Sequence, residues 1–220
     1  LGALKQLDRV YALSTSPFVV CLNHDDFWEE TFLEKVLSNG LLKHDHCSLA
    51  YSLYSSRYRH KTEAATNHLV ADFSTGVHNP LLHVVFSNWI QLSFTVFRRD
   101  FFDSVGGFSR IISLSSIGNF NKNRLLAGDS YSWARLLTKG PAYVVRERLG
   151  TKRHHENSYG KINKTRHLEE VIFFNQAVFS DHETFDDETR YFSLLVIISR
   201  LTQKKKLEDA ITELFEKSLF

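Results

Sequence analysis

Apolar residues recur along the chain in two alternating patterns, one typical of helices and one typical of buried strands. Helical spacing over residues 2–13 predicts a first helix. Residues 18–22 are apolar at every position, as in a central strand of a parallel sheet that helices cover on both faces. A short amphipathic helix should follow over 32–37 and end at Asn39 and Gly40, which readily form a left-handed cap.

The same alternation continues to about residue 160. Further elements are predicted as strands at 47–54, 92–99 and 141–149, helices at 81–89, 100–105 and 129–139, loops at 55–67 and 113–123, and a sharp break at Gly106 and Gly107. Strands that alternate with helices indicate an α/β domain. Beyond Lys164 the pattern is helical, so we expect a domain over 1–160 and a separate helical appendage over 161–220.

Composition and charge exclude several classes of protein. The 220 residues are 43% hydrophobic with a net charge of +2, which fits neither a nucleic-acid-binding protein nor a disordered one. No apolar stretch approaches the length of a membrane span, and two cysteines cannot form a disulfide framework, which favours a reducing compartment. The chain contains no methionine and begins within a helical pattern, so we expect it to be a fragment.

Asp25 and Asp26 follow the first predicted strand directly. Carboxylates at the carboxyl end of a parallel strand lie in the crevice where open α/β sheets bind ligands. Two adjacent ionised acids need a compensating cation or several donors, and Mg²⁺ or Mn²⁺ on a diphosphate would supply that charge. A solvated turn in which Asp26 caps the next helix explains the pair equally well.

Two further stretches carry candidate chemistry. Asp129 begins a predicted helix within LAGDSYSWARLL, where a helix cap is the simpler interpretation. Arg153 and His155 lie in GTKRHHENS, at the end of a predicted strand. A histidine there can complete a metal shell of aspartates, although this stretch on its own fits a polar loop slightly better.

Taken in order, four segments resemble the family-2 glycosyltransferases, inverting enzymes with the GT-A fold. STSPFVVCLNHDDFW is similar to that family's strand ending in the aspartate-rich donor-binding motif, and FTVFRRDFFDSVGGFS to its acceptor-side segment. GDSYSWARLLTKG resembles the helix that an acidic pair opens, and KRHHENS resembles the closing motif. The resemblance implies an α/β fold: a partial GT-A, Rossmann-like mixed sheet with flanking helices, followed by the C-terminal helical appendage.

The resemblance also implies a role for each matching residue. Asp25 falls on the metal-binding carboxylate of the donor motif, Asp26 on the acid after it, and Asn23 on the acid that contacts the ribose. Asp129 falls on the catalytic base, and His155 on the histidine that reaches the metal and the diphosphate.

Three other residues complete the predicted site. Arg153 is a further donor-binding candidate, because its planar guanidinium matches phosphate oxygens. Trp89 and Trp133 are acceptor-side candidates, with packing in the core as the alternative for both.

The resemblance implies metal-dependent transfer of a sugar, with inversion, from a UDP-sugar or similar donor to a glycan or lipid-linked acceptor. We expect this reaction on the cytoplasmic side, with no nucleic-acid partner. Peripheral contact with the inner face of the membrane through Lys204–Lys206 is conceivable, but a solvated helix face explains these lysines better.

Departures from the family pattern leave an alternative open. Asn23 and Gly128 replace expected acids, and the family's amino-terminal half has no counterpart in the chain. We therefore expect this fragment to be inactive and poorly stable, with an uncovered sheet edge beside residues 18–22. The alternative is a non-catalytic, glycosyltransferase-like binding or scaffold module, and a metal-dependent phosphohydrolase ranks below both.

Overall fold

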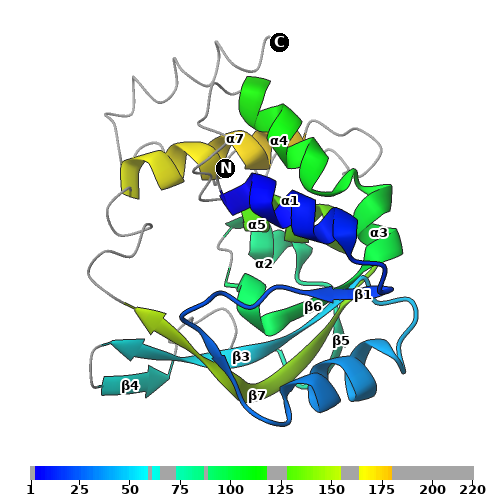
Figure 1. Ribbon diagram of the computed structural model, residues 1–220, viewed down its shortest axis with the longest axis vertical. Coiled ribbons are helices and arrows are strands. Elements are labelled where there is room, and N and C mark those ends of the chain that lie inside the picture. The colour runs from blue at the N-terminus through cyan, green and yellow to red at the C-terminus, as the bar shows by residue number, and fades with distance from the viewer. Residues whose placement is uncertain are drawn as a thin grey trace.

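The computed structural model describes residues 3–58, 61–64, 73–86, 89–117, 128–154 and 164–179. Within these ranges, seven strands form one mixed sheet (Figure 1). The strands are β1 (Phe18–Val20), β2 (Phe27–Trp28), β3 (Leu49–Tyr58), β4 (Lys61–Ala64), β5 (Gly76–His78), β6 (Thr95–Arg98) and β7 (Ala142–His154). The main path is β1-β6-β3-β7-β2, with β4 paired to β3 and β5 paired to β7.

The pairing directions bring three strand ends together. Strand β6 pairs antiparallel with both β1 and β3, and β3 pairs parallel with β7. Strands β1, β3 and β7 therefore run in the same direction, and their carboxyl ends lie at the same end of the sheet (Figure 1). This is the end at which α/β sheets commonly bind ligands.

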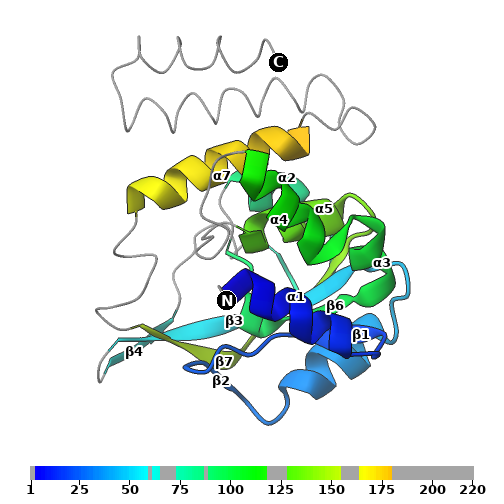
Figure 2. The same cartoon turned by 45° about the horizontal axis from the view of Figure 1, so that its top comes forward.

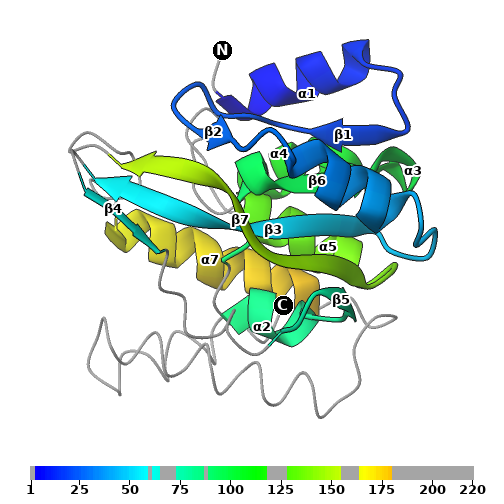
Figure 3. The ribbon, with the colours of Figure 1, turned by 90° about the horizontal axis from the view of Figure 1, so that it is seen from below.

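Helices cover both faces of the sheet. On one face lie α2 (Leu81–Phe86), α3 (Arg99–Ser104), α4 (Gly107–Ile117) and α5 (Gly128–Leu137), with α1 (Ala3–Leu13) against α4 and α7 (Lys164–Phe179) against α5 (Figure 2). On the other face lies η1 (Glu34–Leu41), a helix with π-type hydrogen bonding, which Figure 3 shows from below. The short 3₁₀ helix η3 (Leu92–Phe94) leads into β6.

Alternation along the strands divides the core into two clusters. Leu49 and Tyr51 of β3 pack in the larger cluster with the helices α2, α4 and α5, whereas Ala50 packs with Val36 and Leu41 of η1. Successive strand residues point to opposite faces, so a strand with helices on both sides must be apolar at consecutive positions. All five of these side chains are at most 1% exposed.

The α/β class and most predicted elements are confirmed. Helix α1 matches the predicted range closely, and the backbone N–H of Leu81 donates to Asn79 Oδ1 at 3.2 Å, as expected at the start of α2. Gly106 and Gly107 have φ values of 88° and 54°, which a glycine adopts without the clash of a Cβ. The predicted break between α3 and α4 depends on these two residues.

Several predicted boundaries are wrong. Strand β1 lies at the end of the described sheet and pairs antiparallel, because β6 rather than a parallel strand lies beside it. The predicted loop at 55–67 contains the end of β3 and all of β4, whose polar residues pair in a hairpin. Helix α4 continues to Ile117, into the predicted loop, and Gly40 lies inside η1 instead of forming a left-handed cap.

The predicted boundary at residue 160 lies outside the described residues. Helix α7, which belongs to the predicted appendage, places Phe174 and Val178 in the larger core cluster, where Phe174 contacts Tyr131 of α5. This helix therefore shares its core with the α/β domain. None of the helices in the described part of the chain is both long enough and apolar enough to span a bilayer.

Candidate functional site

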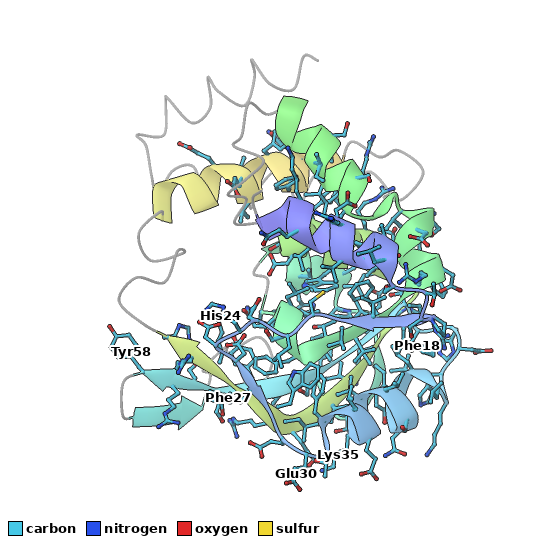
Figure 4. The ribbon with its side chains drawn as sticks, viewed as in Figure 1. Phe18, His24, Phe27, Glu30, Lys35 and Tyr58 are labelled. Atoms are coloured by element: carbon cyan, nitrogen blue, oxygen red, sulfur yellow. The ribbon has the colours of Figure 1, made fainter. Side chains whose placement is uncertain are left out.

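The acidic pair lies beyond the carboxyl end of β1, which ends at Val20. Figure 4 shows His24, the residue before the pair, near the same end of the sheet as Tyr58, the last residue of β3. Phe18, at the start of β1, lies at the opposite end. The chain reaches this position because β1 ends at Val20 and a turn follows, closed by a hydrogen bond from the N–H of Asp26 to the carbonyl of Asn23 at 3.1 Å.

Asp26 is the most enclosed of the predicted site residues in this loop, with 7% of its surface exposed. Its Oδ2 accepts hydrogen bonds from Ser93 Oγ at 2.6 Å and from Asn23 Nδ2 at 3.1 Å. Its Oδ1 accepts from the backbone N–H of Arg153 at 3.2 Å. A buried polar group needs hydrogen-bond partners, and these three donors supply them to Asp26. Asp26 thereby ties the loop after β1 to η3 and to the end of β7.

Ser93 is the second fixed point of the loop. Besides donating to Asp26, its hydroxyl accepts from the backbone N–H of Asn23 at 3.1 Å, and its carbonyl accepts from the indole Nε1 of Trp28 at 2.5 Å. The residue is fully buried. Ser93 thus holds both sides of the acidic pair.

The network explains asparagine at position 23. Its side-chain nitrogen donates to Asp26, whereas an ionised aspartate at this position would have no hydrogen to donate and would repel Asp26. Asn23 therefore stabilises the loop from within the chain. This internal contact is a use of residue 23 that the ribose-binding prediction does not include.

Asp129 lies in the first turn of α5 and is half-buried. Its Oδ1 accepts a hydrogen bond from the backbone N–H of Ser130 at 2.7 Å, which satisfies one of the N–H groups that the first turn of a helix leaves without an intrahelical partner. The negative charge of Asp129 also acts on two side chains outside its own helix, Tyr54 of β3 and Lys152 of β7. Asp129 thus binds the backbone of its own helix and also acts electrostatically on the same two strand residues as Asp26.

Tyr54 and Lys152 connect the two acidic segments electrostatically. Burial and the charges of Asp26 and Asp129 raise the pKa of Tyr54 to about 12. Burial lowers the pKa of Lys152, and the attraction of Asp129, Asp26 and Asp25 opposes that effect. Three carboxylates from two distant parts of the chain are therefore near enough to one ammonium for their charges to act on it. We call Asp25, Asp26, Asp129 and Lys152 the charge cluster.

Lys152 is held in place by a neighbour. Its Nζ donates a hydrogen bond to Gln91 Oε1, in the segment that leads into η3. Tyr54 is fixed by stacking on Phe94, with ring centroids 5.0 Å apart and an interplanar angle of 12°. Both side chains are thus ordered by the same short segment that carries Ser93.

The structure places other predicted site residues differently. The guanidinium of Arg153 lies 5.7 Å from the ring centroid of Phe27, and strand alternation directs it away from the face that Lys152 occupies. Trp89 and Trp133 are 3% and 1% exposed, and both rings pack in the larger core cluster, so neither offers a free face to a sugar. His155 lies outside the described residues.

Sequence reasoning missed Lys152, Tyr54, Ser93 and Gln91. The sequence does show two adjacent cations, Lys152 and Arg153, and only one of them can point to the face of the strand that carries the site. Strand β7 contains register irregularities opposite Ser52–Leu53 and Leu53–Ser55 of β3, so its alternation cannot be counted from its start. Nothing in the sequence near Ser93 or Gln91 indicates a role in a site.

The donor set allows a metal bound partly by substrate. Among the described residues, no three side chains of histidine, cysteine, aspartate or glutamate converge as a ready-made metal site. Mg²⁺ is commonly held by one or two carboxylates together with phosphate oxygens and water. Asp25, half-buried beside the well-anchored Asp26, fits that kind of site, because both oxygens of Asp26 already accept hydrogen bonds within the protein.

No family model matches the chain, and no curated protein has a significantly similar sequence.

Proposed function

We propose that the charge cluster is the donor and catalytic site of an inverting glycosyltransferase that uses a UDP-sugar or similar nucleotide-sugar. The observation that carries the proposal is that Asp26 and Asp129, far apart in the sequence, act on the same two side chains, Tyr54 and Lys152. The order of the motifs along the chain supports it as well. The acceptor would be a glycan or lipid-linked sugar at the cytoplasmic side of a membrane.

Each residue has a task in this reaction. The acceptor hydroxyl oxygen forms a bond to the anomeric carbon while the bond from that carbon to the diphosphate oxygen breaks and its electron pair leaves with the diphosphate. The carboxylate of Asp129 takes the proton of the acceptor hydroxyl. Asp26 holds the loop that carries Asp25. A divalent metal, held by Asp25, would supply positive charge to the leaving diphosphate.

Substitution of Asp129 tests the base. In the full-length protein, Asp129→Asn keeps an acceptor for the Ser130 N–H but cannot take a proton, so donor-dependent release of UDP should fall at least about 100-fold. Binding of UDP should remain measurable by calorimetry.

Asp100 provides the matched control. It lies in the first turn of α3 and accepts from the N–H of the next residue at 2.9 Å, as Asp129 does in α5. Asp100→Asn should leave turnover unchanged. Equal turnover by wild type and Asp129→Asn would show that Asp129 is not the base.

A second function, a non-catalytic binding or scaffold module, has one specific observation in its favour. Asn23 uses its amide to stabilise Asp26, and Gly128 stands where the family has a second acid. Both features preserve the shape of the loop and helix without the full set of carboxylates. Calorimetry of UDP with and without Mn²⁺ separates the two functions, because a scaffold module would show no metal-dependent binding.

A further inference from the structure

The charge cluster has a feature that the predicted catalytic set does not use. Lys152 lies at the end of β7, one residue before the Arg153 N–H that donates to Asp26, and the charges of Asp129, Asp26 and Asp25 attract its ammonium. A diphosphate could not approach Asp25, Asp26 and Asp129 against their combined negative charge unless a cation compensated it. Lys152 is a cation next to the residue whose backbone holds Asp26.

The position of Lys152 is set by contacts on both sides. Lys152 comes directly before Arg153, whose backbone N–H donates to Asp26 at 3.2 Å. The backbone of Lys152 is therefore next to the point at which β7 holds the Asp26 carboxylate. Its Nζ donates to Gln91 Oε1, and Gln91 is itself fixed because its carbonyl accepts from Thr95 Oγ1 at 2.8 Å. The β3–β7 register aligns Lys152 with Ser56, two residues beyond Tyr54.

Burial disfavours the charged form of Lys152 more than the three carboxylates favour it. The pKa of Lys152 is lowered although Asp129, Asp26 and Asp25 all attract the charged form. If Lys152 served only to neutralise the neighbouring acids, their attraction should outweigh the effect of burial and raise its pKa. An unfavourable charge that persists at the carboxyl ends of three parallel-running strands is more typical of a binding group than of a structural one.

We propose that the Lys152 ammonium, oriented by Gln91, binds the diphosphate of the donor directly and stays on it as the sugar departs. This inference rests on the proposed function and assigns a catalytic residue that the family resemblance does not. A lysine is a compact cation with three donors, so it can pair with phosphate oxygens and still keep Gln91 as a hydrogen-bond partner.

Calorimetric titration of UDP into the full-length protein, in the presence of Mn²⁺, tests the contact. Lys152→Gln should weaken UDP binding about 10- to 100-fold, the loss expected for a charge-assisted hydrogen bond. Lys152→Arg should retain most of the affinity because it keeps the charge. Lys139→Gln, which alters an exposed lysine at the end of α5, should have no effect.

Thermal unfolding of the same variants separates binding from structure. Because burial lowers the pKa of Lys152, removing its charge should not lower the melting temperature. A lysine that served only to hold the carboxylates together would show the opposite result, a lower melting temperature with unchanged UDP affinity.

A third measurement uses only the wild-type protein, so its result does not depend on whether a variant folds. Acetylation of lysines, followed by mass spectrometry, should show UDP protecting Lys152 but not Lys139. Equal acetylation of Lys152 with and without UDP, in a protein that binds UDP, would overturn the role of Lys152 and leave the proposed function standing. Failure of the wild-type protein to bind UDP at all would overturn both.

Discussion

Asp26 joins the loop after β1 to η3 and to the end of β7 through its two carboxylate oxygens. The sequence places it beside Asp25 as a donor-binding acid or a helix cap. In the structure its two oxygens accept from three donors, among them the buried hydroxyl of Ser93. Such a role cannot be predicted from local sequence, because Ser93 and Arg153 come close only when η3 and β7 are in place.

Truncation of Asp26 should therefore affect stability as well as activity. Asp26→Ala would leave the Ser93 hydroxyl without its acceptor inside the protein and release the loop from β7. We expect a loss of about 2–4 kcal/mol in the free energy of unfolding, measured by urea denaturation.

Asp45 is the appropriate comparison, because its side chain is 99% exposed. Asp45→Ala should change the free energy of unfolding by less than about 0.5 kcal/mol. Similar stabilities for the two variants would contradict the anchoring role of Asp26.

At the scale of elements, strand β7 decides which side chains reach the site. The pattern of apolar residues predicts a strand ending at residue 149, but β7 continues to His154 because β3 pairs with it along its polar end. Irregular register of the β3–β7 pairing then decides which side chains point to which face, so that Lys152 contacts Gln91 and Arg153 lies over Phe27. Helices α1 and α5 were predictable because their spacing and first-turn residues are local signals, whereas strand phase depends on pairing.

Gly150 of β7 packs closely against Phe27 of β2 and Phe94 of η3. A Cβ at this position would lie 2.4 Å from the Phe94 ring and 2.5 Å from the carbonyl oxygen of Phe27. Gly150→Ala should therefore push β2 away from β7 and lower the free energy of unfolding by about 1–3 kcal/mol. Urea denaturation measures this loss.

Gly128, at the start of α5, offers the matched substitution. The nearest atom to a Cβ there is Ile111 Cγ2 at 3.4 Å, and alanine favours a helix over glycine. Gly128→Ala should leave stability unchanged or slightly higher. An equal loss in both variants would mean that the close approach at Gly150 does not matter.

At the scale of the whole molecule, the α/β class and the order of the candidate motifs were accessible from sequence, but the arrangement of the sheet was not. Strand β6 enters the sheet antiparallel between β1 and β3, which sequence proximity does not predict. That insertion still leaves β1, β3 and β7 running in one direction. The loop after β1 and the start of α5 can therefore act on the same residues of β3 and β7.

The central claim is that these separate segments form one diphosphate site. Hydrogen–deuterium exchange of the full-length protein, with and without UDP and Mn²⁺, tests it most directly because it reports on all segments at once. We predict slower exchange on addition of UDP in residues 21–28, 128–133 and 150–154 together, with α1 unchanged. Protection that is absent from all three segments, or confined to only one of them, would contradict the claim.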